Sequence, residues 1–352
     1  MSVIIPVRNE GAALGPCLDA VLAQTYPPDS IEVIVVDAHS HDGTLEVAES
    51  YARRDARVRV LANPVGTIPA GLNLGIRASR GDVLARVDAR ARLAPDYLET
   101  AVALLRTTGA DNVGGPVRSV TTTAVGQALA LAWSSRLGLG SASARYGDGE
   151  EHWTDTVYLG AAPRRVFESV GLYDEAISQD EDTEFNYRLR ARGGRVLMSP
   201  RLRTSYVNDP SLVRIALKNF QFGACKVAVW RKHPSMLRMR HFVPPLFVAA
   251  LALGPAMAWA HPMAAALWSL GVGGYAVACL SVAARSYVQR RERGALLLPI
   301  VLPLIHLSWG AGFLVGILRL LRGRPTASPG IVPGGERLTT PSAQASGREG
   351  VR

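Results

Sequence analysis

Cysteine is scarce in this sequence, and the few that occur follow no binding pattern. Cys17, Cys225 and Cys279 lie far apart and form no C-x-x-C pair. This spacing argues against a disulfide framework and against a cysteine zinc site, and it fits a reducing compartment. The N-terminus also lacks a basic segment followed by a long apolar stretch, because MSVIIPVRNE leads directly into a short apolar run. We therefore expect no cleaved signal peptide and a first domain that stays in the cytosol.

Acidic residues are nearly absent between Phe242 and Leu321, where the chain is mostly apolar. Phe242–Ala260 contains 19 uncharged residues, and at about 1.5 Å per residue such a helix nearly crosses a hydrocarbon core of about 30 Å. The uncharged run Met263–Ala284 follows a short turn, so the two runs predict a transmembrane hairpin. Basic residues flank the hairpin, which predicts that both flanks are cytoplasmic. They are Arg231, Lys232, Arg238, Arg240, Arg285, Arg290, Arg291 and Arg293.

The third apolar run, Ala295–Leu321, is compatible with two topologies. As a full span it would leave Arg322 and Arg324 outside, against the positive-inside rule. Two prolines and the break at SWGAG allow a kinked or re-entrant segment instead. We expect two to three transmembrane segments within residues 242–321, with three as the favoured number. The tail at residues 322–352 is rich in Pro, Gly, Ser and Thr, which predicts disorder.

The stretch before the hairpin, residues 206–241, contains an amphipathic helical pattern. It predicts a helix that lies in the membrane interface with its apolar side toward lipid. The pattern fits equally well a helix packed on its own domain, so both interpretations stay open. The apolar side holds Val213, Leu217, Phe220, Ala224, Val227 and Trp230, and the polar side holds Arg214, Lys218, Gln221 and Lys226.

Residues 1–205 alternate apolar strand-like runs with helical patterns, which is typical of an α/β domain with a mostly parallel sheet. The expected strands are Val3–Pro6, Glu32–Val36, Val58–Leu61, Val83–Val87 and Asn112–Val117, and the expected helices include Ala12–Gln24 and Pro95–Leu105. In such sheets ligands bind beyond the carboxyl ends of the strands. Asp37 and Asp88 lie directly after two strands, where a carboxylate can bind a nucleoside or face a metal ion. A structural role is also open, since Asp37 can cap the following turn.

Four carboxylates gather in SQDEDTEF, although the chain has a net charge of +10: Asp180, Glu181, Asp182 and Glu184. A helix start explains most of them, because Ser178 or Asp180 can cap a helix and acids suit its first turn. Glu184 also lies four residues before Arg188, a favourable helical pair. Two adjacent acids can in addition provide a general base, because one raises the proton affinity of the other.

Four segments of the first 205 residues together resemble family 2 glycosyltransferases, which are inverting enzymes with a GT-A fold. They are SVIIPVRNE, IEVIVVDAHSHDGT, NLGIRASRGDVLARVDARA and GLYDEAISQDEDTEFNYRLRARGGRV, in the order and spacing of that family. The membrane region with HLSWGAGFL resembles the succinoglycan-type exopolysaccharide glycosyltransferases. The resemblance implies a GT-A domain with a mostly parallel twisted sheet at residues 1–205, followed by C-terminal transmembrane helices.

The resemblance also implies a nucleotide site, with Asp37 at the uracil end of a UDP-sugar. Its expected residues are Pro6, Arg8, Asn9, Glu10, Asp37 and Asp88. The family's metal-facing D-x-D motif corresponds here to Asp88-Ala89-Arg90, so the second acid is missing. Either Asp88 holds Mg²⁺ or Mn²⁺ together with water and phosphate, or Arg90 or Arg92 neutralises part of the diphosphate charge. We expect the metal to be retained.

By the family's E-D motif, the resemblance makes Asp182 the catalytic base. Glu181 is then the neighbour that contacts the acceptor or orients Asp182, and Asp180 is the rival for the role of base. The acceptor or donor-sugar side is expected to hold Arg90, Gly114, Gly115, Gly160 and Asp180, although glycines more often mark simple turns.

The predicted function is transfer of a hexose from a nucleotide sugar, UDP-linked, to a polyprenyl-phosphate-type lipid acceptor in exopolysaccharide or glycolipid synthesis. The protein is expected to be multi-pass in the cell membrane, with its catalytic domain on the cytoplasmic side. Membrane lipids and other polysaccharide-assembly proteins are the expected partners. Nucleic acid is not expected, because the arginines cluster beside the membrane runs.

The sequence also bears on three other functions. A processive synthase is disfavoured because no Q-x-x-R-W sequence precedes the membrane segments. A transporter is disfavoured because the apolar runs hold no charge at membrane depth, His306 apart, that could form a substrate pathway. The alternative that stays open is a non-catalytic scaffold that binds nucleotide sugar or lipid within a polysaccharide assembly complex, which the incomplete D-x-D favours.

Overall fold

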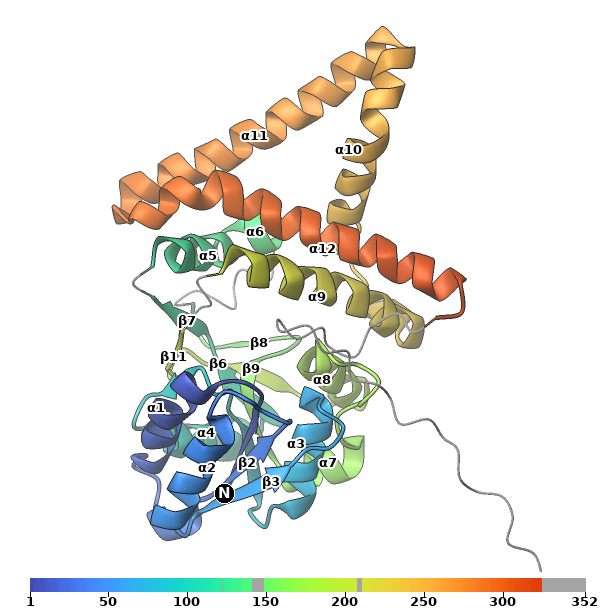
Figure 1. The fold of residues 1–352 in the computed structure, drawn as a ribbon. Helices are drawn as coiled ribbons and strands as arrows, with labels where there is room; N and C mark the ends of the chain where they lie inside the picture. Colours follow the sequence, from blue (N-terminus) through green and yellow to red (C-terminus); the bar gives the residue numbers. More distant parts are fainter. Residues whose placement is uncertain (122, 141–148, 208–210, 325–352) are drawn as a thin grey trace, which may run out of the picture.

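The computed structural model describes residues 1–121, 123–140, 149–207 and 211–324, so the predicted tail from residue 322 lies almost wholly outside the described residues. Figure 1 shows an α/β body that contains the N-terminus and, above it, a layer of long helices. The strands are β1 Ser2–Val7, β2 Glu32–Asp37, β3 Val58–Ala62, β4 Val83–Arg86, β5 Ala91–Leu93, β6 Asn112–Gly115, β7 Val117–Val120, β8 His152–Trp153, β9 Tyr158–Pro163, β10 Val196–Met198 and β11 Thr204–Val207. The helices are α1 Gly11–Leu22, α2 Thr44–Arg54, α3 Ile68–Ala78, α4 Tyr97–Thr108, α5 Ala124–Ser134, α6 Arg136–Leu139, α7 Arg164–Val170, α8 Glu181–Ala191, α9 Leu212–Lys232, α10 Val243–Ala260, α11 Pro262–Arg290 and α12 Leu298–Leu321.

The body is built on an eight-stranded mixed sheet in the order β3-β2-β1-β4-β9-β6-β10-β8. Strands β3, β2, β1 and β4 run parallel, and so do β6 and β10, whereas β9 and β8 run antiparallel to their neighbours. Parallel pairing brings the carboxyl ends of β1, β2, β3 and β4 to one edge. The predicted α/β domain with a mostly parallel sheet is confirmed, and β5, β11 and β7 add a small second sheet.

One predicted strand, Asn112–Val117, is wrong, because the structure divides it at Pro116. β6 ends at Gly115 in the large sheet, and β7 starts at Val117 in the small one. Proline has no N–H to donate to a strand ladder, so the chain leaves one sheet there and joins another.

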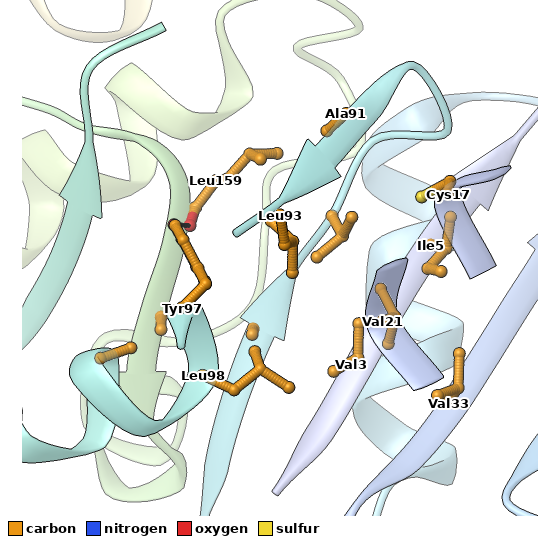
Figure 2. Packing of buried hydrophobic residues seen from close by; sticks show 14 of the residues in the cluster. Val3, Ile5, Cys17, Val21, Val33, Ala91, Leu93, Tyr97, Leu98 and Leu159 are labelled. Atoms are coloured by element: carbon orange, nitrogen blue, oxygen red, sulfur yellow. Dashed lines mark hydrogen bonds between the residues drawn. The ribbon is translucent and has the colours of Figure 1, made fainter. Parts of the chain in front are cut away.

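Both faces of the large sheet are buried, because its central strands are apolar at nearly every position. In β1, Val3 and Ile5 pack into the core beneath α1 and α4, whereas Ile4 packs into the opposite core with α3. Figure 2 shows the first core, in which the Tyr97 hydroxyl donates to the Leu159 carbonyl at 2.9 Å. Packing on both faces holds the strands in place. It therefore also fixes the edge of the sheet where the loops after β1 to β4 meet.

Among the described residues, three helices are long and apolar enough to cross a membrane: those that contain α10, α11 and α12. α10 and α11 form the predicted hairpin, joined at His261, and project away from the body (Figure 1). Their most apolar windows are 11% and 6% buried, against 39% for α12. α12 is more buried because it runs alongside α9 above the body (Figure 1).

α12 runs unbroken through SWGAG, contrary to the predicted break. Its glycines permit close packing on α9: a Cβ on Gly312 would lie 1.9 Å from the carbonyl oxygen of Phe220, and one on Gly316 would lie 3.0 Å from that of Ala224. Ala224 and Val227, both on the predicted apolar side of α9, are buried. α12 therefore covers part of the apolar side of α9. The sequence had suggested that this side faces either lipid or the α/β domain.

The two ends of α12 have different contacts. At its start, the 3₁₀ segment Arg293–Leu297 packs on α5, and the Gly294 N–H donates to Gln127 Oε1 at 3.1 Å. At its end, Arg319 lines a cavity together with Asp88 of the body. α12 therefore lies across the body instead of leading away from it.

α5 and α6 also belong to the helical layer, although their sequence falls within residues 1–205. Buried residues of α5 share a hydrophobic core with α9, α11 and α12. They are Ala128, Leu129, Leu131 and Ala132. This core joins the body to the helical layer through a second segment besides α9.

Candidate active site

A cavity of about 300 Å³ lies where the carboxyl ends of the parallel strands face the helical layer. Its walls come from two sources. The body contributes the loops after β1, β3 and β4 and the segment before α8, with Pro6, Arg8, Glu10, Asn63, Thr67, Asp88, Arg90, Ser178 and Gln179. The helical layer contributes α9 and the end of α12, with Lys218, Phe220, Gln221, Ala224, Cys225 and Arg319. Five of the predicted site residues thus meet in one cavity: Pro6, Arg8, Glu10, Asp88 and Arg90.

Glu10 and Arg90 connect the loop after β1 with the loop after β4. Arg90 Nε lies 2.8 Å from each carboxylate oxygen of Glu10. Arg90 occupies the position of the second acid in the family's D-x-D motif, and here its side chain is bound to Glu10. Arg8 lines the same cavity, and its buried Nε has no hydrogen-bond partner among the described residues.

Asp37 has the structural role that the sequence left open, and one of its oxygens has no partner in the described part of the chain. The Ser40 N–H donates to Asp37 Oδ2 at 3.1 Å, which holds the turn after β2. The other oxygen, Oδ1, is buried and has no partner in the described part of the chain. An unsatisfied buried carboxylate oxygen is costly unless a ligand supplies a donor. Its neighbours Val36 and Ala38 line the cavity, whereas Asp37 itself is not among the lining residues.

Asn9 holds the loops together instead of lining the cavity. Its backbone N–H donates to Ser40 Oγ and its Oδ1 accepts from the His41 N–H, both at 2.9 Å. Asn9 has a φ of 53°, a conformation that asparagine tolerates better than most residues.

The loop after β3 belongs to the site, although the sequence analysis did not single it out. The side chain of Asn63 accepts from the Gly66 N–H at 3.1 Å and donates to the Thr67 carbonyl at 2.8 Å. The buried Thr67 hydroxyl oxygen has no partner among the residues described, and Thr67 lines the cavity. The polar stretch ANPVGT, directly after an apolar strand, was the signal that could have identified this loop.

Arg86 connects the end of β4 with the acidic start of α8. Its Nε donates to Asp88 Oδ1 at 3.0 Å, and its Nη1 donates to Glu181 Oε1 at 2.6 Å. The side chains of Arg86 and Glu181 are only 11% and 6% exposed. Burial opposes the charge on Arg86, but Asp88, Glu181 and Asp182 outweigh it and raise the pKa of Arg86 well above its usual value.

Glu181 has an unusual protonation equilibrium. Burial raises its pKa from 4.5 to about 7, with Arg86 opposing and Asp182 adding to the shift. A buried carboxyl with a pKa near neutrality is typical of functional sites.

The Glu181→Gln variant should lose a pH dependence of stability that the wild type has. Because the folded state holds the Glu181 proton more tightly than the unfolded state, stability should fall as pH rises from 4.5 through about 7. Glutamine does not titrate, so thermal unfolding of the purified protein from pH 5 to about pH 8 should show a shallower decline. Exposed Glu46→Gln is the matched control. Equal slopes for wild type and Glu181→Gln would contradict the prediction.

The remaining acids of this cluster have distinct partners. Asp180 forms an ion pair with Lys226 of α9. Glu184 binds Arg188 at 2.8 Å, the predicted helical pair, and also His233 Nε2 at 2.9 Å. Asp182 Oδ1 accepts from the Thr183 N–H at 2.7 Å.

The three predicted glycines pack strands together and do not line the cavity. A Cβ on Gly114 would lie 2.6 Å from the Tyr158 carbonyl oxygen, and one on Gly115 would lie 1.8 Å from that of Leu202. A Cβ on Gly160 would lie 2.6 Å from Asn112 Oδ1. Close packing against a backbone carbonyl or a side-chain amide explains all three, and none of them lines the cavity.

The described residues contain no group of three or more His, Cys, Asp or Glu that could hold a metal ion. Asp88 lines the cavity and is the one carboxylate of the incomplete D-x-D. Mg²⁺ commonly binds through one or two carboxylates, with waters and substrate phosphates completing its shell. Asp88 therefore fits a metal that arrives with a diphosphate substrate, and does not fit a cage made by the protein alone.

Comparisons with known proteins agree on one family. Residues 2–153 match the family described as Glycosyl transferase family 2. The chain is 31% identical over 313 residues to the succinoglycan biosynthesis protein ExoA of Rhizobium meliloti (strain 1021), a match that covers 88% of this chain and 93% of that protein. It is 24% identical to the dolichyl N-acetyl-alpha-D-glucosaminyl phosphate 3-beta-D-2,3-diacetamido-2,3-dideoxy-beta-D-glucuronosyltransferase of Methanococcus voltae, covering 91% and 97% of the two chains.

A solved structure shows the same fold. It is the mannosyltransferase PcManGT from Pyrobaculum calidifontis in complex with GDP-Man and Mn²⁺, with a TM-score of 0.53 and 20% identity. The match covers 91% of this chain and 86% of that one, and at this identity it concerns the fold alone.

Proposed function

This chain belongs to glycosyl transferase family 2, and we propose that it transfers a hexose, with inversion, from a UDP-sugar to a lipid-linked acceptor in exopolysaccharide or glycolipid synthesis. The observation that carries the proposal is the cavity itself. It lies at the strand ends, where nucleotides bind in α/β folds, and its other wall is made by helices next to apolar segments.

The nucleotide side of the proposed site consists of residues with unmet hydrogen-bonding capacity. Asp37 Oδ1 would accept from the base, and Arg8 Nε would donate to the nucleotide. Arg90 is held by Glu10 at the cavity wall, where its positive charge favours a diphosphate.

Asp182 is the proposed base. It would take the proton of the acceptor hydroxyl while that oxygen forms a bond to the anomeric carbon and the bond to the UDP oxygen breaks on the opposite face. Glu181, buried and bound to Arg86, would orient the start of α8 and add negative charge near the oxocarbenium-like centre.

A divalent metal, Mg²⁺ or Mn²⁺, is proposed at Asp88. When bound, such an ion would neutralise charge on the diphosphate leaving group. The mannosyltransferase of similar fold is described in complex with Mn²⁺. Activity that survives exhaustive EDTA treatment unchanged would contradict this assignment.

The acceptor is proposed to be a polyprenyl-phosphate-type lipid that enters from the helical layer. Lys218 of α9 and Arg319 of α12 line the cavity on that side, and cations there suit a phosphate-bearing lipid. The name of the Methanococcus voltae relative refers to a dolichyl phosphate, and that of the Rhizobium meliloti relative to succinoglycan.

The function is tested by nucleotide release from membranes that contain the protein. UDP-hexoses and GDP-mannose would be supplied in turn, with a polyprenyl-lipid extract and Mn²⁺ or Mg²⁺. Release that depends on both one donor and the extract supports the proposal. Release with a water-soluble sugar acceptor alone would contradict the lipid acceptor, and nucleotide binding without release would favour the scaffold alternative.

The membrane topology proposed here has two spans, α10 and α11, with α12 lying along the interface. The start of α12 follows a segment packed on α5, and its end lines the cavity beside the α/β body, so we infer that α12 does not cross a bilayer between these two points. This arrangement keeps Arg322 on the same side as the catalytic domain, the cytoplasmic side, in agreement with the positive-inside rule.

Cysteine labelling in intact cells should reveal this topology. The native cysteines are buried, so a membrane-impermeant maleimide should leave the wild type unlabelled. The His261→Cys variant, at the turn between α10 and α11, should label from outside, whereas Arg322→Cys should label only after permeabilisation. Labelling of Arg322→Cys in intact cells would indicate three spans.

A further inference from the structure

The helical layer contacts the acidic start of α8 directly. Asp180, the residue before the first turn of α8, forms an ion pair with Lys226 of α9. The two side chains are only 16% and 12% exposed. A pair shielded to this degree is less weakened by solvent than a surface pair.

Asp180 has an unusual backbone, which makes the contact consequential. Its φ of 72° is in the left-handed region, and its side chain makes no capping hydrogen bond to α8. Its carbonyl nevertheless starts the helix, accepting from the Glu184 N–H at 3.0 Å. The left-handed conformation costs about 1 kcal/mol even for residues that tolerate it. A side-chain partner outside α8 stabilises this helix start.

Lys226 is carried by a helix that is itself fixed. Its neighbours Cys225 and Val227 are buried, and α9 packs closely along α12. Cys225 also lies 3.5 Å from the hydroxyl of Ser178, just before the acidic cluster. The position of Lys226 thus depends on the helical layer, whereas that of Glu181 depends on the body through Arg86.

We propose that Lys226 is a positioning residue: by holding Asp180, it fixes the start of α8 and thereby places Asp182 for transfer. The proposal rests on the proposed role of Asp182 as base. It gives the helical layer a catalytic contribution beyond membrane attachment, because the layer supports the geometry of the reacting carboxylate. A displacement of about 1 Å at a reacting group can cost about a hundredfold in rate.

The test compares Lys226→Met with Lys226→Arg in the full-length protein. We expect Lys226→Met to lower kcat by about tenfold to a hundredfold, with donor KM and UDP affinity changed less than about twofold. Lys226→Arg keeps the cation and should recover most of kcat. Lys232→Met is the matched control, because Lys232 is on the same helix and pairs with Asp174 while its own side chain is 50% exposed. It should behave like the wild type.

A second variant covers the case in which Lys226→Met fails to accumulate. Asp180→Asn leaves α9 unchanged and keeps a residue type that tolerates the left-handed region, but it removes the ion pair. It should reproduce the loss in kcat, and the double variant Lys226→Met/Asp180→Asn should be no worse than either single one.

Two results would overturn the proposal. One is wild-type kcat in Lys226→Met, and the other is equal loss in Lys226→Met and Lys226→Arg. Both presuppose an active wild type. If the wild type released no nucleotide from any donor, the proposed function would fail first, so the two failures are distinguishable.

Discussion

Replacing Asp182 with asparagine should reduce transfer by about a thousandfold, because the acceptor hydroxyl would lose the carboxylate that takes its proton. Asparagine has nearly the same shape and keeps an oxygen that can accept from the Thr183 N–H, as Asp182 Oδ1 does. The start of α8 should therefore remain in place. Nucleotide affinity should change by less than about twofold, because Asp182 is not among the residues that line the cavity with Arg8, Glu10 and Asp88.

The measurement is donor-specific nucleotide release together with UDP binding to the same preparation. Asp174→Asn is the matched control: it alters a carboxylate in the segment before α8 that pairs with Lys232. We expect this control to transfer at nearly the wild-type rate. Turnover near that of the wild type in Asp182→Asn would refute the assignment of the base, and Asp180→Asn would then have to be compared as the rival.

The strand ends of the site were predictable because one physical rule governs them. Apolar runs followed by polar residues mark buried parallel strands, and parallel strands bring those polar residues to one edge. Asp88 was placed in this way, whereas Pro6, Arg8 and Glu10 were implied by the family resemblance, and all four line the cavity. The GT-A fold and the family, expected from four ordered motifs, are confirmed by the comparisons.

Arg86 was not identified as a site residue because its partner is 95 residues away in the chain. The run VLARVD predicts a strand, but the sequence does not indicate which residue its arginine contacts. A charged residue inside a strand that is otherwise buried needs a counter-ion, and that requirement was the available signal. Its partner, Glu181, was recognised only as one member of an acidic cluster.

The arrangement of the helical layer was beyond what hydropathy can predict. Hydropathy reports that Ala295–Leu321 is long and apolar, but the direction of a helix depends on what packs against it. Here Gly312 and Gly316 permit contact with α9, and α5 supplies a further apolar surface. α5 was missed because an apolar helix of 11 residues is too short to be noticed as a membrane segment.

Removing Arg86 should give the largest loss of stability among the site residues. In Arg86→Met, the buried carboxylate of Glu181 and the partly exposed one of Asp88 would lose the cation that lies 2.6 Å and 3.0 Å from them. Breaking a buried ion pair by deleting one partner costs about 3–5 kcal/mol. We expect the apparent melting temperature of the purified protein at pH 8 to fall by about 5–10 °C.

The pH dependence and a second substitution separate this effect from lost packing. Without Arg86, Glu181 should bind its proton even more readily than its pKa of about 7 implies, so the destabilisation should shrink toward pH 5.5, where the carboxyl is neutral. The double variant Arg86→Met/Glu181→Gln removes the unpaired charge and should regain part of the stability at pH 8. Transfer should stay impaired in the double variant, because the start of α8 loses its contact with β4. An Arg86→Met protein that melts like the wild type at pH 8 would contradict the assignment, since no counter-ion would then be needed at Glu181.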